Sequence, residues 1–354
     1  MFDLYEDAER LTKNTPFEEF ISPYQDLRYY ASSVTPGLRL AANIIKPEQP
    51  ASILIQLHGW HMSMPKPEKR EVPLPGAPYL VVQIDMRGRA FSEGNADCNG
   101  LELIDIYDAV QFVRSQYAGL IADPAIIHLE GGSGGGGNVL AAVNKFPDFF
   151  ASAVGLYGIS DYAEWYKQDQ KGEFRDDMDI WIGYPPEANE EGFKARSGLY
   201  LLDNLQVPLY IAHGDGDIRV PVQHSRQFIE KAEQRNKTHL LRYTELTGVG
   251  GWGHLDHITD DQRNLIRQEG ERQRLEHSVP ISIPEAGRLW VGGYLYTKPF
   301  QVHLESIDQL AILDYDQETG IMNLTARKPY AYRIQKADGT VVEGKCSVVE
   351  DLVI

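Results

Sequence analysis

The chain has 354 residues and carries 51 Asp and Glu against 34 Lys and Arg residues, a net charge of −17. This negative field repels DNA, RNA and anionic lipid, so we expect neither a nucleic acid nor a membrane as partner. Hydrophobic residues make up 42% of the chain, which is ordinary for a globular protein and excludes a disordered one.

The apolar runs, the first ten residues and the cysteines of the chain indicate its cellular compartment. No apolar run approaches the roughly 20 residues that span a bilayer. The start, MFDLYEDAER, lacks the basic and then apolar pattern of a secretory signal. Cys98 and Cys346 are too few for a disulfide framework or a thiolate metal site. These features predict a cytoplasmic protein.

Short apolar runs alternate with helix-period segments along the first part of the chain, which is typical of α/β proteins with a mostly parallel sheet flanked by helices. The expected strands are 25–32, 38–44, 52–57, 79–84, 125–130, 152–157, 207–212 and 239–243. The first two flank a Pro36-Gly37 turn and are expected to pair as an antiparallel hairpin.

Three helices are expected between or after these strands. Ile106, Val110, Val113 and Tyr117 recur at helical spacing, and residues 222–235 and 259–277 have similar patterns. The five prolines of residues 65–78 make a long helix there unfavourable. Residues 159–200, rich in Asp, Glu, Tyr and Trp, are expected to form a short helical cap.

A second, all-β domain is expected at the C-terminal end. From about residue 281, short hairpin-like strands alternate with turn signals such as QETG and ADGT. We therefore divide the chain into a catalytic domain, residues 1–278, and a β-rich accessory domain, residues 279–354. Exposed strand edges of this accessory domain favour a homo-oligomer.

The most informative segment is AIIHLEGGSGGGGN, an apolar strand followed by a glycine cluster and a helix-like stretch. Gly131, Ser133 and Gly135 fit G-x-S-x-G, the pattern of a sharp strand-to-helix turn that exposes a nucleophilic serine. The same cluster also fits the dinucleotide pattern G-x-G-x-x-G through Gly132, Gly134 and Gly137. It does not follow the first strand of the sheet and lacks the acidic residue about 20 positions on, so we favour the serine.

A nucleophilic serine needs a histidine as base and a carboxylate that orients this histidine. Both follow in the expected order Ser, acid, His, in the segments HGDGDIRVP and GVGGWGHLDH after the next strands. Asp217 and His254 are the candidates, with Asp215 and His257 as nearby alternatives.

The chain resembles the prolyl-oligopeptidase-like and acetyl-xylan-esterase-like branches of the α/β-hydrolase superfamily. Five ordered motifs carry the resemblance: H-G-W at 58–60, D-x-R-G at 85–88, G-x-S-x-G at 131–135, H-G-x-x-D-x-x-V-P at 213–221 and G-H at 253–254. Ala90 stands where the family usually has Gly, and the proline-rich 65–78 replaces an expected helix.

The resemblance implies an α/β-hydrolase fold without metal or organic cofactor. It implies Asp217 rather than Asp215 as the acid, and an oxyanion hole formed by the backbone N–H groups of Trp60 and Gly134. Asp85 and Arg87 are interpreted as a supporting ion pair.

Further residues are candidates for substrate binding or for metal. His61, Trp165, Trp181 and Trp252 follow strands on the face where α/β proteins bind ligands, although Trp165 and Trp181 could equally anchor the cap. His58 with His61, or His254 with His257, would be metal pairs, but a third ligand with suitable spacing is missing.

The sequence therefore predicts a serine esterase that acts through Ser133, His254 and Asp217 on short-acyl or carbohydrate-linked esters. The first alternative is a serine peptidase or aminopeptidase of the prolyl oligopeptidase type, with a short peptide as substrate. The second is a non-catalytic binding or scaffold protein with a degenerate hydrolase domain.

Overall fold

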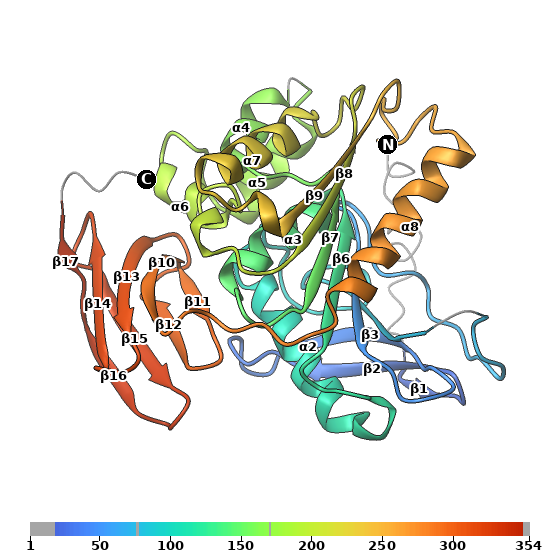
Figure 1. The fold of residues 1–354 in the computed structure, drawn as a ribbon, viewed down its shortest axis with the longest axis horizontal. Helices are drawn as coiled ribbons and strands as arrows, with labels where there is room; N and C mark the ends of the chain where they lie inside the picture. The colour runs from blue at the N-terminus through green and yellow to red at the C-terminus, as the bar shows by residue number, and fades with distance from the viewer. Residues whose placement is uncertain (1–17, 76–77, 170, 350–354) are drawn as a thin grey trace.

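The computed structural model describes residues 18–75, 78–169 and 171–349, and its centre is a nine-stranded sheet (Figure 1). The spatial order is β1-β2-β3-β5-β4-β6-β7-β8-β9. The strands are β1 (Phe20–Ile21), β2 (Gln25–Ala31), β3 (Arg39–Ile45), β4 (Ile53–Leu57), β5 (Leu80–Ile84), β6 (Ile127–Gly132), β7 (Ser152–Leu156), β8 (Leu209–Gly214) and β9 (Leu241–Leu246). Strands β4 to β9 are parallel, whereas β1, β2 and β3 join them through antiparallel pairs.

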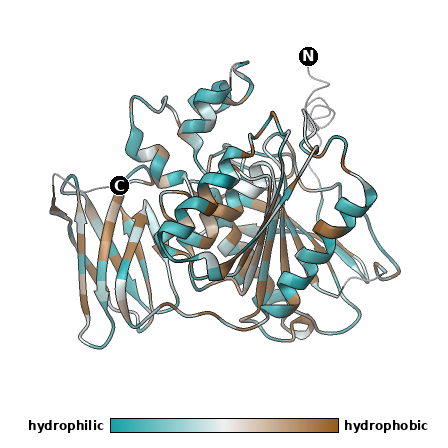
Figure 2. Ribbon diagram, turned by 45° about the horizontal axis from the view of Figure 1, so that its top comes forward, coloured by the Kyte–Doolittle hydropathy of each residue, from teal (hydrophilic) through white to brown (hydrophobic). Residues whose placement is uncertain are grey.

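Helices cover both faces of this sheet because the side chains of its strands alternate between two apolar clusters. In β8, Leu209 and Ile211 pack into the larger cluster, and Tyr210 and Ala212 pack into a smaller one on the opposite face. The larger cluster contains side chains of α2 (Glu102–Gln116), α3 (Gly134–Lys145) and α7 (Gln223–Gln234), and the smaller one is covered by α8 (Asp260–Glu276). Figure 2 shows hydrophobic residues concentrated along the central strands.

Residues 159–200, which we call the cap segment, lie between β7 and β8, and their described part contains three short helices. These are α4 (Tyr162–Gln168), α5 (Glu173–Trp181) and α6 (Glu190–Arg196). Asp161 begins α4 because its carboxylate accepts hydrogen bonds from two free backbone N–H groups of the first turn. Between β4 and β5, the described residues form neither helix nor strand, as the prolines predict. No helix in the described part of the chain is long and apolar enough to cross a membrane.

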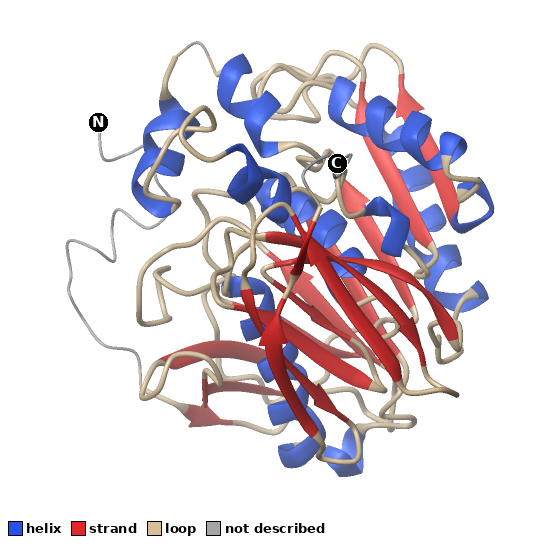
Figure 3. Ribbon diagram, turned by 90° about the vertical axis from the view of Figure 1, so that its left-hand side faces the viewer, coloured by secondary structure: helices blue, strands red, loops and turns tan. Residues whose placement is uncertain are grey.

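The C-terminal region forms a second, eight-stranded sheet with its own apolar core (Figure 3). Its strands are β10 (Ala286–Gly292), β11 (Tyr294–Tyr296), β12 (Phe300–Leu304), β13 (Leu310–Asp316), β14 (Ile321–Ala326), β15 (Ala331–Lys336), β16 (Val341–Lys345) and β17 (Ser347–Val348). Their order is β16-β15-β12-β11-β10-β13-β14-β17. The α/β architecture with a C-terminal all-β region, expected from the sequence, is confirmed, and its predicted strands and helices agree with the structure within a few residues.

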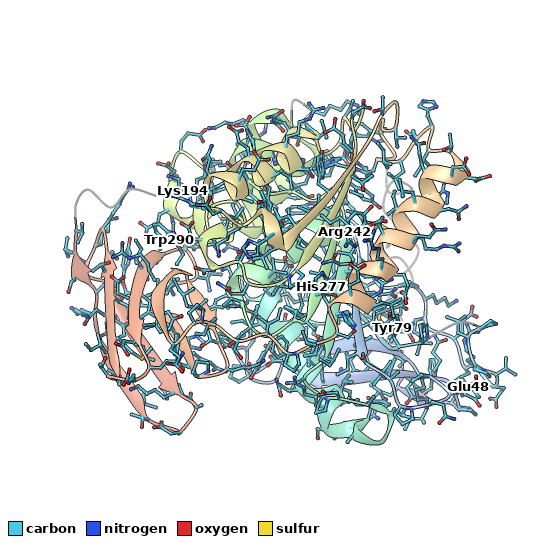
Figure 4. All side chains as sticks on the ribbon, in the orientation of Figure 1. Glu48, Tyr79, Lys194, Arg242, His277 and Trp290 are labelled. Carbon is cyan, nitrogen blue, oxygen red and sulfur yellow. The ribbon has the colours of Figure 1, made fainter. Side chains whose placement is uncertain are left out.

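Buried polar contacts fasten the second sheet to the rest of the molecule. Arg196 of α6 is 2% exposed and bridges Asp97, at 2.7 Å, and Asp308 between β12 and β13, at 2.8 Å. The Asn204 side chain exchanges two hydrogen bonds with the backbone of Trp290. Figure 4 labels Trp290 and Lys194 where β10 and α6 approach each other. The second sheet therefore contacts the cap segment directly.

The Arg196 bridge yields a stability prediction. Arg196→Ala leaves two carboxylates without their buried partner, so we expect it to lower the free energy of unfolding by about 3–5 kcal/mol. The matched control is Arg288→Ala, because the Arg288–Asp314 pair is exposed, and its loss should cost about 1 kcal/mol or less. Urea unfolding followed by tryptophan fluorescence compares the two, and equal effects would contradict the role of the bridge.

Candidate active site

Ser133 occupies a strained turn between β6 and α3. Its backbone angles, φ 57° and ψ −122°, lie in a region that residues with a side chain rarely adopt. Two backbone hydrogen bonds hold the turn: Ser133 N donates to Leu156 O, and Gly137 N donates to Ser133 O. The chain thus reverses sharply from strand to helix at the serine, as the G-x-S-x-G pattern predicts.

The loop after β4 packs directly on this turn. A Cβ atom at Gly134 would lie only 2.6 Å from the backbone nitrogen of Trp60, so only glycine permits this approach. A Cβ at Gly59 would lie 3.8 Å from Ser133 Cβ. The two backbone N–H groups predicted to form the oxyanion hole, those of Trp60 and Gly134, therefore belong to segments in contact beside Ser133.

His254 and Asp217 are hydrogen-bonded to each other. His254 Nδ1 lies 2.8 Å from Asp217 Oδ2, and both residues are buried. The glycine-rich loop before His254 makes this contact possible, because a Cβ at Gly250 would lie 2.1 Å from Asp217 N. Gly250 also has a φ of 140°, which favours glycine. The loops after β8 and β9 are therefore packed against each other at the backbone.

Asp217 is held in its charged form. Its Oδ1 accepts hydrogen bonds from the backbone N–H groups of Arg219 and Val220, at 2.9 and 3.0 Å. Burial alone would raise the pKa of Asp217, but hydrogen bonds from His213 and His254 outweigh it and lower that pKa. A charged carboxylate at His254 Nδ1 keeps the proton on this nitrogen and leaves Nε2 as the acceptor.

Tyr157 connects the serine turn to the histidine, and the sequence analysis missed it. Its ring stacks on the His254 ring, with centroids 4.7 Å apart and planes 14° apart. A Cβ at Gly132 would lie 2.8 Å from Tyr157 Oη, so the same side chain also contacts the residue before Ser133. The available signal was its position directly after β7, at the edge of the sheet where the other site residues lie.

The two alternative residues lie apart from this arrangement. Asp215 Oδ1 accepts a hydrogen bond from Gly248 N, at 2.8 Å. His257 is exposed, whereas His254 is 9% exposed. Asp217 and His254, the residues that the motif spacing selects, are thus the pair in contact.

Asp85 and Arg87 have structural contacts, but they do not form the pair that the sequence suggested. The Arg87 guanidinium makes two 2.6 Å hydrogen bonds with Asp105 of α2. Asp85 instead accepts hydrogen bonds from the backbone N–H groups of Met64, Phe91 and Ser92. The expectation of an Asp85–Arg87 pair is wrong, because Arg87 pairs with a helix carboxylate and Asp85 is used by backbone N–H groups of the loops after β4 and β5.

The tryptophans expected near the substrate form a packed aromatic cluster with Trp60. The Trp60 ring stacks on Trp181 at 4.6 Å and meets Trp165 edge-on at 5.0 Å. Trp165 is only 2% exposed, and its Nε1 donates to Arg219 O at 2.9 Å. The cluster joins the loop after β4, the cap segment and the loop after β8, and it leaves Trp165 little surface for a ligand.

Trp252 and His61 have different surroundings. Trp252 is 38% exposed and lines a cleft of about 310 Å³ with the cap segment, where Lys171 Nζ lies 3.9 Å from its ring centroid. His61 is mostly buried and contacts the α5 carboxylate of Asp177. A second cavity, of about 430 Å³, lies beside the loop 58–65 and is lined in part by Gly131 and Gly132. The second cavity therefore lies beside the turn at Ser133, and the first lies beside the loop after β8.

No cluster of three or more potential metal ligands occurs among the residues that the structure describes. His58, one member of a suggested metal pair, uses both ring nitrogens in other ways: Nδ1 contacts Gly59 O at 2.8 Å, and Nε2 accepts from Met86 N at 3.0 Å. Burial, assisted by the charge of Arg89, lowers the pKa of His58 to about 3. His58 therefore ties the ends of β4 and β5 together as a neutral side chain.

A neutral His58 predicts a specific pH dependence of stability. Its pKa is lower in the folded state than the ordinary value of 6.5, so the unfolded state takes up a proton first as the pH falls. His58, His128 and His224 should each contribute a loss of stability as the pH falls from 6.5 towards 3. Glu102, Asp105 and Asp148, whose pKa values burial raises, contribute in the opposite direction, so the His58 contribution is read from the difference between the variant and wild type. His58→Asn should flatten this slope by up to about 1.4 kcal/mol per pH unit. Urea unfolding at several pH values measures it, and an unchanged slope would contradict a neutral buried His58.

The sequence of the chain is similar to known proteins of one family. Residues 70–251, half of the chain, match the model of the prolyl oligopeptidase family, Peptidase_S9. The chain is 28% identical over 223 residues to the uncharacterized peptidase YtmA of Bacillus subtilis, covering 62% of this chain and 84% of that protein. It is 28% identical over 240 residues to dipeptidyl peptidase family member 6 of Caenorhabditis elegans, covering 62% of this chain and 31% of that protein.

Two further matches extend the comparison. The probable carboxylic ester hydrolase LipM of Mycobacterium tuberculosis is 26% identical over 158 residues, which cover 41% of this chain and 36% of that protein. The structure of the Pyrococcus horikoshii acylaminoacyl peptidase superposes with a TM-score of 0.57 at 21% identity, covering 78% of this chain and 44% of that one, and this likeness shows the fold. By its matching family model and its fold, the chain belongs to the prolyl oligopeptidase family of α/β-hydrolases.

Proposed function

We propose that the chain hydrolyses carboxylic acyl bonds through a triad of Ser133, His254 and Asp217. One observation carries this proposal: a strained serine turn and a buried His–Asp pair, from segments far apart in sequence, both contact Tyr157. A strained backbone at a serine is itself a mark of a functional site.

In this mechanism, His254 Nε2 takes the proton from the Ser133 hydroxyl while the serine oxygen attacks the carbonyl carbon of the substrate. The backbone N–H groups of Trp60 and Gly134 stabilise the negative charge that develops on the carbonyl oxygen. His254 then gives its proton to the leaving group, and water releases the acyl group from Ser133 by the reverse sequence of proton transfers. Asp217 keeps His254 in the required tautomer.

The names of the relatives support a peptide substrate more than an ester. Two of them are described as peptidases and one as a probable carboxylic ester hydrolase. The ester preference expected from the sequence has no support beyond the last of these. We therefore propose short peptides or aminoacyl amides as the first substrate class and small esters as the second.

Activity against two substrate classes tests this proposal. We expect wild type to hydrolyse aminoacyl or dipeptidyl p-nitroanilides, with p-nitrophenyl esters of increasing acyl length as the second panel. Ser133→Ala should lower kcat/KM to background, because it removes the nucleophile. Release of nitroaniline or nitrophenol is followed by absorbance.

Matched controls use the neighbouring residues of the same type. Asp217→Asn should lower kcat by about 10⁴-fold through the wrong histidine tautomer, whereas Asp215→Asn and His257→Gln should retain activity. Ester turnover without anilide turnover would move the assignment to an esterase. An active Ser133→Ala variant, or an inert wild type on both panels, would contradict the proposal and favour a binding or scaffold role.

A further inference from the structure

Helix α5 of the cap segment carries two carboxylates, Glu173 and Asp177, that face the proposed catalytic loops. They are four residues apart and therefore lie on the same side of the helix. Their side chains are 25% and 21% exposed, so both lie mostly within the protein. The mechanism above uses neither of them.

Asp177 binds two consecutive residues of the loop after β4, which carries the proposed oxyanion donor Trp60. Its Oδ2 accepts a hydrogen bond from Trp60 Nε1 at 2.9 Å and lies 2.6 Å from His61 Nε2. The Trp60 side chain carrying this N–H is buried among aromatic rings, where an unsatisfied donor is costly. A carboxylate acceptor makes a stronger and more directional contact than a neutral one. The contact therefore restrains the side chain of the residue whose backbone N–H is the proposed oxyanion donor.

Glu173 connects His61 to the loop after β8, which contains Asp217. Its Oε1 lies 3.0 Å from Arg219 Nη2 and 3.5 Å from His61 Nδ1. The backbone N–H of Arg219 in turn donates to Asp217 Oδ1 at 2.9 Å. The His61 ring is also stacked on Phe174 of α5, with centroids 5.5 Å apart. One short helix thus contacts both loops on which the proposed reaction depends.

We propose that Asp177 is a positioning residue that holds the backbone N–H of Trp60 at the oxyanion, with Glu173 supporting it through His61 and Arg219. This inference rests on the proposed function, because it assigns Trp60 to the oxyanion hole. It makes the cap segment part of the catalytic arrangement. Asp177 acts through Trp60 and does not touch the reacting atoms.

The expected effect is on the chemical step. A displacement of the donor by a fraction of an ångström weakens its bond to the developing oxyanion, and a misplacement of about 1 Å can reduce rate by about 100-fold. We expect Asp177→Ala to lower kcat by about 10- to 100-fold and to leave KM unchanged. Asp177→Asn should recover part of this loss, because its amide oxygen still accepts the Trp60 N–H.

Asp176→Asn is the matched control, because Asp176 is the exposed neighbour of Asp177 on the same helix. It should retain the wild-type kcat. A double-mutant cycle with Trp60→Phe, which removes the indole N–H and keeps an aromatic ring, tests the link between the two residues. The losses from Trp60→Phe and Asp177→Ala, each of which removes this hydrogen bond, should be clearly less than additive. Two independent structural effects would be additive instead.

The outcomes separate the two proposals. If wild type hydrolyses neither substrate panel, the proposed function fails. If wild type is active and Asp177→Ala retains its kcat, or if the cycle is additive, the positioning role is overturned. If Asp177→Ala does not fold, as judged by its thermal midpoint, the near-isosteric Asp177→Leu, which also lacks an acceptor, replaces it in both measurements. A higher KM with an unchanged kcat would also overturn the inference.

Discussion

The strained backbone of Ser133 is the constraint on which the remaining site depends. A non-glycine residue with this conformation costs about 1–3 kcal/mol, so the surrounding structure must hold it in place. Strand β6 is paired on both sides within the parallel sheet, and every residue of α3 is buried. The strain is therefore offset by two elements whose positions are determined by the core.

The close packing around this turn determines where the other site residues lie. Glycine at the start of α3 lets the loop after β4 approach at backbone distance, which brings Trp60 beside the serine. Glycine at position 250 lets the loop after β9 contact the loop after β8 in the same way, which brings His254 to Asp217. Tyr157 contacts both groups. Small residues at these backbone contacts thus determine the geometry of larger functional side chains.

The second sheet and the cap segment form a continuous set of contacts that ends at the proposed oxyanion hole. Asp308, in the loop between β12 and β13, binds Arg196 at the end of α6. Helix α6 packs on α4, which packs on α5. Helix α5 then contacts Trp60 and His61 through Asp177. This arrangement gives the C-terminal sheet a structural relation to the site, in addition to the oligomer interface that the sequence analysis predicts.

The sequence predicted the elements whose signals are local. The apolar runs of β4 to β9 and the amphipathic stripe of α2 follow from periodicity, and the turn at Ser133 follows from its glycines. The spacing from His213 to Asp217 also selected the carboxylate that contacts His254 in the structure.

Contacts between segments distant in sequence had no such signal. Arg87 pairs with Asp105 instead of Asp85, Tyr157 stacks on His254, and Asp177 binds Trp60, because each depends on how elements pack in three dimensions. The sequence placed Trp165 near the site, but it did not predict that this side chain is buried.

One measurement tests most directly whether Ser133 is the activated nucleophile: labelling with a serine-directed fluorophosphonate, followed by mass spectrometry of the modified peptide. The account predicts an adduct on Ser133 that forms far more slowly in His254→Ala. An adduct on another serine, or equal labelling of the two proteins, would contradict it.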